Sequence, residues 1–544
     1  MSVEWDPVCE PRVVAHPAVE GLLQKRLQGV RDGFRQNVVL LGPPGSGKTS
    51  TVFSALATVP PEFLIIYWEG RREPWDLWVT RCVTAVLQGI LGFRTEPLNT
   101  ATPQELLRHT AAIAPQTSQV SAELLAHLKP LPHERIFRQV LELPQTACAE
   151  TQRPGVLVWD EFHHAESLGV HRPFHELGKL IMVESSLLYL LISSQPLQAQ
   201  RIVRERLNLL FGGFEVVTLD GLEPLVAETW LRDQCRPRRL PDALAAFLAW
   251  LTAGHLWSLS TLAAAMARQP GRGECSPAEL IRLVAEELAD GRRPLAHWCL
   301  QRLREVEQAR TSTAYVHLLL TLAGRRSTLR VLAQATHQAV SETSRQLGRL
   351  VEWGLVTRQG EVYMSDSPLW SFWLRQVFQV RRHATVTTVA GMTQRVTQQL
   401  EADWHAFYRE HTRAPFQRFL GLLGQFQNEL VRVDNRRVRL PQFTQVEREA
   451  LGAGTHRVIA QPATGLPWLY WVKESHLREG DVVAFTQRSH GTPQRVGARV
   501  VVGLEDCEPA ALLLAKASRL WVWHQPTLQA LHQLYRLPAL GVDP

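Results

Sequence analysis

One short stretch constrains this chain more than any other: residues 38–51 have the sequence VVLLGPPGSGKTST. Its four leading apolar residues predict a buried strand of a parallel sheet. A glycine-rich turn ends that strand, and the segment from Lys48 onward is compatible with a helix. A turn of the form G-x-x-x-x-G-K-[ST] between a strand and a helix is the arrangement that binds the phosphates of a nucleoside triphosphate.

Each residue type in this loop has a chemical reason. Glycines let backbone N–H groups point at phosphate oxygens, and the N-terminus of the helix adds partial positive charge. We expect Lys48 to reach the β- and γ-phosphates and the Thr49 hydroxyl to bind Mg²⁺. The predicted cofactors are therefore ATP and Mg²⁺. The predicted nucleotide-binding residues are Gly42, Pro43, Pro44, Gly45, Ser46, Gly47, Lys48, Thr49 and Ser50.

A second apolar run, residues 156–161 (VLVWDE), ends in two acids about 110 residues later. After a phosphate loop this is the Walker B arrangement. It predicts Asp160 as a Mg²⁺ ligand with Thr49, and Glu161 as the base for the attacking water. The following His163 and His164 lack the spacing of a zinc site. We expect them to be polar surface near the site.

Residues 185–194 (SSLLYLLISS) predict the neighbouring strand. Ser194 or Gln195 at its end is placed to contact the γ-phosphate or the water, the role called sensor 1. The arginines at positions 201, 204 and 206 follow on an expected helix. One of them is predicted to be an arginine finger in a neighbouring subunit's site, and a solvated helix face is the alternative. The predicted catalytic set is Glu161, Lys48, Ser194 and Arg206.

Length and composition set the broad class. At 544 residues the chain is expected to form three to four domains, and 45% hydrophobic with 20% charged residues is ordinary globular composition. No uncharged apolar run is long enough for a membrane span, and the N-terminus has no signal-peptide pattern. The seven cysteines are scattered without a C-x-x-C pair, which fits a reducing cytoplasm.

Positive charge is concentrated in one segment. Residues 310–383 contain ten arginines, no lysine and four acids, so most of the chain's net charge of +7 lies there. A compact basic segment is typical of a nucleic-acid contact. Of the 59 basic residues in the chain, however, 53 are arginine. That bias has genome composition as an alternative cause.

The same segment has the pattern of three helices followed by a hairpin. Helices are expected at residues 313–323, 327–337 and 342–353, and the hairpin surrounds a short tip at 358–360. This order resembles a winged helix, in which the third helix enters the major groove of double-stranded DNA. In that helix we expect Leu347, Leu350 and Val351 to face the core, with Gln346 outward. The predicted DNA-binding residues are Arg345, Arg349, Arg326, Arg330 and Arg358, and a protein-interaction module is the alternative.

Taken together, GPPGSGKT, VLVWDE, a strand ending in Ser-Ser and a helical segment after residue 222 resemble AAA+ and STAND ATPases. Among these families, the chain is most similar to the archaeal ATPase family related to origin-recognition ATPases, over about residues 15–270. Two departures stand out. The sequence TAGHLW at 252–257 lacks the proline of the Gly-Gly-x-Pro lid motif, and no arginine stands where many AAA+ lids place sensor 2.

The resemblance implies an α/β fold with a P-loop AAA+ parallel-sheet core, an all-α lid, a winged-helix domain and a mixed α/β C-terminal domain. The corresponding segments are 1–221, 222–309, 310–383, 384–414 (a helical connector) and 415–544.

In that family a nuclease-like domain follows the winged helix. Residues 468–473 (WLYWVK) look like the strand that carries Glu-x-Lys in restriction-like nucleases. The metal-binding acid falls at Trp471, and residues 457–461 lack its partner acid. Because two carboxylates are needed to hold Mg²⁺ for such chemistry, we expect an inactive domain that keeps a surface for an unknown protein partner.

Three functions fit these patterns. The first is a cytoplasmic ATPase that hydrolyses ATP slowly, forms a homo-oligomer on ATP binding, and uses its nucleotide state to control DNA binding or assembly. The second is a STAND-type signalling or scaffold ATPase in which the winged helix is a spacer and the C-terminal domain senses a partner. The third is an accessory protein of transposition or defence that recruits a nuclease or recombinase.

Overall fold

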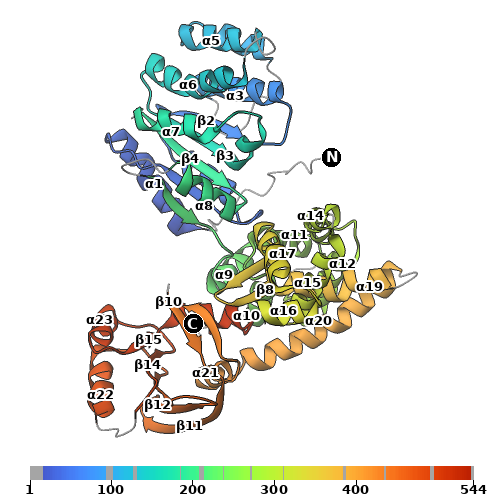
Figure 1. Cartoon of the computed structure of the whole chain (residues 1–544), viewed down its shortest axis with the longest axis vertical. Helices are drawn as coiled ribbons and strands as arrows, with labels where there is room; N and C mark the ends of the chain where they lie inside the picture. The colour runs from blue at the N-terminus through green and yellow to red at the C-terminus, as the bar shows by residue number, and fades with distance from the viewer. Residues whose placement is uncertain are drawn as a thin grey trace. The chain divides into compact units, whose positions relative to one another are not determined.

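The computed structural model describes residues 16–92, 102–126, 132–183, 186–207, 213–236, 238–269, 273–309, 311–383, 388–433, 436–490 and 495–540. Contacts divide the chain into two compact units, Met1–Leu222 and Glu223–Pro544 (Figure 1). Among the described residues, none of the helices combines the length and the apolar character needed to cross a membrane.

The first unit is built on a five-stranded, fully parallel sheet with the order β2-β3-β4-β1-β5. This confirms the predicted parallel α/β core. Its strands are β1 (Val38–Leu41), β2 (Leu64–Glu69), β3 (Gly155–Asp160), β4 (Leu187–Ser193) and β5 (Glu215–Thr218). Its helices are α1 (Pro17–Arg31), α2 (Lys48–Ala57), α3 (Trp75–Ile90), α4 (Pro103–Thr110), α5 (Pro115–Ala126), α6 (His133–Thr151), α7 (Pro173–Val183) and α8 (Pro196–Glu205).

Helices cover both faces of this sheet because successive side chains of a strand point to opposite sides. Val38 and Leu40 pack in a core with residues of α1 and α2. Val39 and Leu41 pack in a second core with residues of α3 and α6, which α7 and α8 complete. A strand buried on both faces has no polar alternation, which is why its short apolar run was visible in the sequence.

The second unit begins with helices and continues into a small three-stranded sheet of order β6-β8-β7. The leading helices are α9 (Pro224–Gln234), α10 (Asp242–Thr252), α11 (Leu256–Ala267), α12 (Pro277–Ala289), α13 (Pro294–Arg302) and α14 (Arg304–Gln308). The next elements are α15 (Ser312–Gly324), β6 (Ser327–Thr328), α16 (Leu329–Ala335), α17 (Val340–Glu352), β7 (Val356–Gln359) and β8 (Val362–Ser365). These are the three helices and the hairpin that the sequence predicted, in the expected order.

Two details of this segment differ from expectation. The second helix begins at Leu329, because residues 327–328 pair with β8 instead. Gln346, expected to point outward, is only 2% exposed and donates to the Glu342 carboxylate at 2.8 Å. It shares the inner face with Thr343, Leu347 and Leu350, since residues three and four apart lie on one side of a helix. Val351 is half-buried rather than part of the core.

The rest of the second unit ends in a five-stranded mixed sheet of order β11-β12-β13-β14-β15. Helices α22 and α23 cover one face (Figure 1), and residues of α21 and α24 pack against the other. A separate two-stranded sheet, β10-β9, precedes it. The helices are α18 (Pro368–Trp373), α19 (Gln379–His383), α20 (Val389–His411), α21 (Pro415–Leu423), α22 (Glu479–His490), α23 (Pro509–Ala517) and α24 (Gln525–Leu534). The strands are β9 (Glu429–Val433), β10 (Arg436–Leu440), β11 (Phe443–Gly452), β12 (Thr455–Pro462), β13 (Trp468–Lys473), β14 (Ala498–Gly503) and β15 (Trp521–Trp523).

Candidate active site

The loop between β1 and α2 adopts the backbone conformation that its glycines permit. Gly45 and Gly47 have φ angles of 78° and 89°, and Gly47 is the left-handed residue immediately before α2. Gly42 has a different reason: a Cβ at this position would lie 2.2 Å from the carbonyl oxygen of Leu219. The loop therefore depends on glycine for its turn and for the close approach of the chain after β5.

Lys48 is the buried cation of the loop. Its Nζ donates to the carbonyl oxygens of Gly42 at 2.9 Å and Pro43 at 2.8 Å. Burial lowers the pKa of Lys48, and the nearby carboxylates of Glu161 and Asp160 oppose that shift. The ammonium group thus donates to neutral carbonyl groups of its own loop. The charged oxygens of a triphosphate can take the place of these carbonyl groups as hydrogen-bond acceptors.

Asp160, the last residue of β3, accepts hydrogen bonds from two hydroxyl groups. Its Oδ2 accepts hydrogen bonds from Thr49 Oγ1 at 2.7 Å and from the Tyr67 hydroxyl at 2.8 Å. The strand pairing brings Tyr67 here, because β2 lies beside β3 in the sheet. Burial, followed by the charge of Asp160, raises the pKa of Tyr67, so this hydroxyl keeps its proton and remains a donor. Thr49 and Asp160, predicted as metal ligands, are therefore adjacent.

Glu161 leaves the strand in a left-handed conformation, with φ of 50°. Its Oε2 accepts hydrogen bonds from the backbone N–H and from the hydroxyl of Ser194, both at 2.9 Å. Burial raises the pKa of Glu161, Asp160 adds to the shift, and the Ser194 hydrogen bonds act against it. Of the two residues predicted for the end of β4, Ser194 is the one that contacts this carboxylate.

His163 is not surface, contrary to our expectation. It is 2% exposed, its Nδ1 lies 2.9 Å from Ser193 Oγ, and the same nitrogen lies 3.3 Å from Glu161 Oε2. Burial lowers the pKa of His163 to about 3, so the ring is neutral near pH 7. The histidine is therefore an uncharged hydrogen-bonding group that lies next to Glu161 and Ser193.

Two residues of this site, Tyr67 and Ser193, carried no functional prediction. In the sequence, Tyr67 stands out only as the one hydroxyl-bearing residue of the apolar run 63–68. That run forms the strand next to the one that ends in the Walker B acids. Such a hydroxyl needs a partner when it is buried. The signal for Ser193 was equally small, since Ser193 and Ser194 are consecutive and point to opposite sides of the strand end.

The arginines after β4 do not enter this site from within the chain. Arg201 and Arg204 are exposed on α8. Arg206, just after the helix, forms an ion pair with Glu166. Glu166 also accepts a hydrogen bond from Gln198 at 2.7 Å. The finger assigned to this cluster remains a prediction about a neighbouring subunit.

Four of the five arginines predicted to bind DNA are exposed, namely Arg330, Arg345, Arg349 and Arg358. Arg345 pairs with Glu342 on its own helix at 2.6 Å, and the Arg349 guanidinium lies 3.5 Å from the Tyr315 hydroxyl. Arg326 differs from these four. Its guanidinium pairs with Glu429 at 3.0 Å and lies 3.6 Å from the ring centre of Tyr535. We therefore leave Arg326 out of the DNA-binding surface.

In the C-terminal sheet, Trp471 is 1% exposed and packs with residues of α22 and α23. Its register partner on β12 is Arg457. Lys473 pairs with Asp481 at 3.2 Å. A buried tryptophan thus occupies the position at which the nuclease resemblance would require a metal-binding acid.

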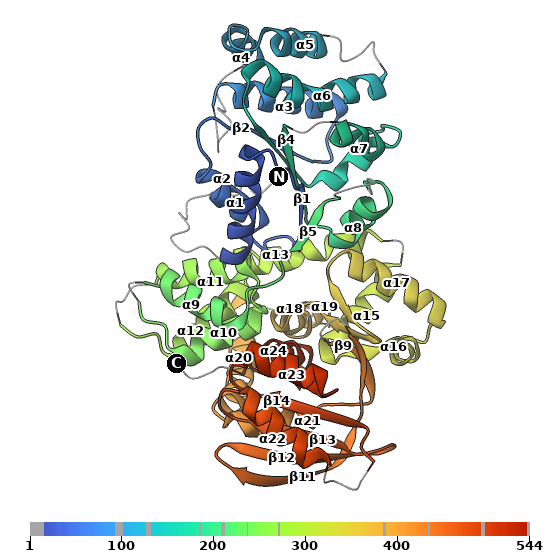
Figure 2. The same cartoon turned by 90° about the vertical axis from the view of Figure 1, so that its left-hand side faces the viewer.

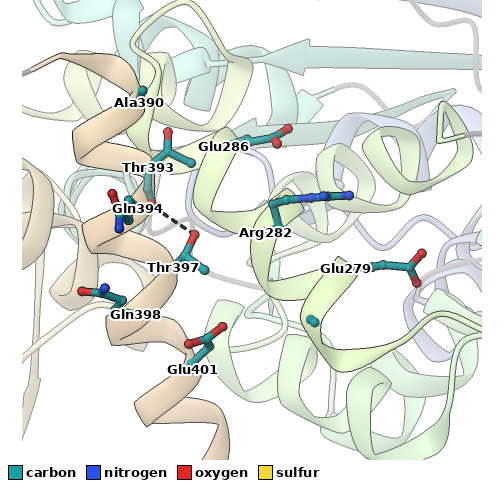
Figure 3. A pocket seen from close by; sticks show the side chains of 10 residues that line it. Glu279, Arg282, Glu286, Ala390, Thr393, Gln394, Thr397, Gln398 and Glu401 are labelled. Carbon is teal, nitrogen blue, oxygen red and sulfur yellow. Dashed lines mark hydrogen bonds between the residues drawn. The ribbon is translucent and has the colours of Figure 1, made fainter.

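A pocket of about 700 Å³ lies between α12 and α20 (Figure 3). Its charged lining consists of three carboxylates, Glu279, Glu286 and Glu401, and one cation, Arg282. Glu279 already caps α12 through Ser276 and pairs with Arg238 at 2.8 Å. The excess negative charge disfavours a phosphate ligand, so we do not assign a nucleotide to this pocket.

The comparisons agree with the geometry of the loop and the Walker B strand. Residues 19–203 match the family model described as "AAA ATPase domain". Residues 19–203 are an AAA ATPase domain. This domain contains β1 to β4, Lys48, Thr49, Asp160, Glu161 and Ser194, and the protein is accordingly a P-loop ATPase. None of the curated proteins compared with the chain resembles it in sequence.

Several solved structures are similar to the chain. The Walker-type ATPase PABY2304 of Pyrococcus abyssi has 16% identity and a TM-score of 0.42, covering 65% of this chain and 95% of its own. The ORC2 protein of Aeropyrum pernix, in ADPNP–ADP complexes, has 12% identity and a TM-score of 0.44, with 70% and 98% covered. A RuvB protein of Thermotoga maritima has 14% identity and a TM-score of 0.29, with 64% and 91% covered.

Proposed function

We propose that the AAA ATPase domain hydrolyses ATP slowly and that its nucleotide state controls binding of double-stranded DNA through the segment α15 to β8. In this proposal Lys48 exchanges its loop carbonyl contacts for the β- and γ-phosphates. Glu161 accepts the proton of the attacking water, and Ser194 holds Glu161 in position. Because Ser194 donates twice to one oxygen of that carboxylate, the other oxygen is left to take the proton.

The residues beside the loop suit a Mg²⁺ ion that accompanies the nucleotide. Thr49 Oγ1 and Asp160 Oδ2 are two oxygen atoms that can coordinate a metal ion, and they lie 2.7 Å apart. Mg²⁺ in nucleotide sites takes one or two protein oxygens and completes its shell with phosphate and water. It is therefore consistent that, in the part of the chain described, no group of three or more His, Cys, Asp and Glu side chains could hold a metal. When bound, the ion would neutralise charge that develops on the phosphate oxygens.

Tyr67 is expected to position Asp160 for that ion. Tyr67→Phe removes one of the two hydroxyl groups on Oδ2, and loss of such a supporting contact typically costs 10–100-fold in metal affinity. We expect the Mg²⁺ concentration for half-maximal ATP binding to rise about tenfold, as measured by titration at fixed ATP. Tyr189→Phe is the matched control, because its buried hydroxyl lies on β4 near Gln145. An equal Mg²⁺ requirement in Tyr67→Phe and the wild type would remove Tyr67 from this role.

The observation that carries the DNA part of the proposal is the face of α17. Arg345 and Arg349 are both exposed and lie one helical turn apart, while Leu347 and Leu350 are buried on the opposite side. In a winged helix this face of the third helix meets base edges and phosphates. We propose that Arg330 and Arg358, which are also exposed, contact the phosphates of the DNA backbone.

Arg345→Ala with Arg349→Ala is expected to weaken DNA binding about tenfold or more while ATP turnover stays unchanged, since each arginine contact contributes on the order of 1 kcal/mol or more. Anisotropy titrations with a labelled duplex, with and without ATP, measure the effect. Arg395→Ala with Arg409→Ala on α20 is a control of equal charge. Equal affinity of the α17 variant and the wild type would instead favour a protein-binding role for α17.

The proposal also includes assembly and a partner. We propose a homo-oligomer formed on ATP binding, in which Arg201, Arg204 or Arg206 of one subunit reaches the phosphates bound by its neighbour. We further propose a cytoplasmic location and a protein partner for the C-terminal sheet. The location is suggested by the cysteine pattern; the six cysteines among the described residues are buried and form no disulfide bonds.

A further inference from the structure

The two-stranded sheet β9–β10, which the sequence analysis did not anticipate, carries a basic face. Val431, Val433 and Leu440 are buried in the core of the C-terminal part. The arginines of the two strands are exposed: Arg432, Arg436, Arg437 and Arg439. Because side chains alternate along a strand, the register places Arg432, Arg437 and Arg439 on one face, whereas Arg436 lies opposite Val433 on the other.

The arrangement of these charges is unfavourable for the ribbon itself. The register places Arg437 directly opposite Arg432. Like charges directly opposite each other destabilise an antiparallel pair. Within the described residues, neither Arg436 nor Arg437 takes part in an ion pair, whereas Arg439 lies 3.5 Å from Glu361.

The ribbon is joined to the hairpin β7–β8, the predicted wing. The backbone N–H of Glu361 donates to the Leu430 carbonyl at 2.9 Å. Gly360 has a φ of 66°, and a Cβ there would lie 2.2 Å from the same carbonyl oxygen. The tip of the wing therefore rests directly on β9, and the close approach requires glycine.

A second anchor holds the start of β9. The Glu429 carboxylate forms an ion pair with the Arg326 guanidinium at 3.0 Å, and it accepts a hydrogen bond from the Tyr535 hydroxyl at 2.9 Å. Arg326 comes from the connection between α15 and β6, so this ion pair ties the ribbon to the winged-helix segment, as the position of β9 in Figure 2 also shows. The ribbon is thus joined at two places to the segment that carries the wing.

We infer that the β9–β10 ribbon is a second phosphate-binding arm beside the wing, through which Arg432 and Arg437 contact the backbone of bound double-stranded DNA. This inference rests on the proposed function, because α17 and the wing bring the duplex to the surface. Phosphate oxygens relieve the repulsion between Arg432 and Arg437, and guanidinium groups bind them with two parallel hydrogen bonds. The ribbon contributes affinity without base readout.

The test is the salt dependence of DNA binding by the full chain. Arg432→Gln and Arg437→Gln are combined in one variant, and a labelled duplex is titrated from about 50 to about 200 mM salt. The plot of log affinity against log salt loses about 0.9 in slope for each phosphate contact removed, so a decrease of about 1.8 is expected. The control variant combines Arg395→Gln and Arg448→Gln, two exposed arginines on other elements, and retains the wild-type slope.

The outcomes separate this inference from the proposal it rests on. A wild-type slope in the ribbon variant, with binding lost in the Arg345→Ala and Arg349→Ala variant, overturns the ribbon and keeps the proposed function. An equal decrease in the ribbon and control variants overturns it as well. Absence of salt-dependent binding by the wild type overturns both.

Arg437→Gln alone keeps the test informative where the double variant does not fold. It removes the like-charge pair, so the melting temperature stays equal or rises while the slope decreases by about 0.9. A lowered melting temperature with an unchanged slope would assign Arg437 a structural role and overturn the inference.

Discussion

Replacement of Glu161 by glutamine is expected to leave ATP binding intact and to lower the turnover number about 10²–10⁴-fold, the usual contribution of a positioned general base. Glutamine has the same shape as glutamate and can still accept from Ser194, but it cannot take a proton from water. Burial of Glu161 and the charge of Asp160 raise the pKa of this carboxyl, which makes it a better base than an exposed glutamate.

Two measurements check this expectation. Equilibrium binding of ATP establishes that the variant still holds the nucleotide, and phosphate release under single-turnover conditions reports the chemical step. Glu176→Gln is the matched control, because Glu176 lies in the same domain and pairs with Arg138 and Lys179. Turnover at the wild-type rate in Glu161→Gln would remove Glu161 as the base.

Lys48→Ala is expected to weaken ATP binding about 100-fold or more. Hydrogen bonds to charged groups contribute roughly 1.5–3 kcal/mol each, and Lys48 is assigned two phosphates, so about 3 kcal/mol is the lower estimate. The buried ammonium at present has carbonyl partners within its own loop. Removal of this side chain is therefore expected to lower the affinity for ATP more than the stability of the fold.

Calorimetric titration of the variant with ATP measures the loss. Lys179→Ala is the control, since this lysine is half-exposed and pairs with Glu176 on the surface of α7. Affinity within a few-fold of the wild type in Lys48→Ala would contradict the assignment of the loop.

The sequence predicted the parts of the site that are encoded locally. Lys48, Thr49 and the glycines lie within one loop whose spacing carries the chemistry, and Asp160 and Glu161 end a strand with a distinctive apolar run. The sheet order was not accessible in this way. It placed Tyr67 against Asp160, 93 residues further along the chain, and no local pattern reports a pairing of that kind.

The same limit explains the differences in the second unit. Arg326 was assigned to DNA because its neighbours are basic, yet its partner Glu429 lies on a strand about 100 residues later. Gln346 was placed outward because it is polar, whereas the helical period puts it with Leu347 and Leu350. The ribbon β9–β10 was not predicted because its two short strands mix four arginines with five apolar side chains and so lack a continuous apolar run.

The most direct test of the central claim is calorimetric titration of the intact wild-type chain with ATP and Mg²⁺. The residues gathered around the loop predict saturable binding of one nucleotide per chain, with affinity that falls when Mg²⁺ is removed. The absence of binding heat for both ATP and GTP, confirmed by equilibrium dialysis, would contradict the account.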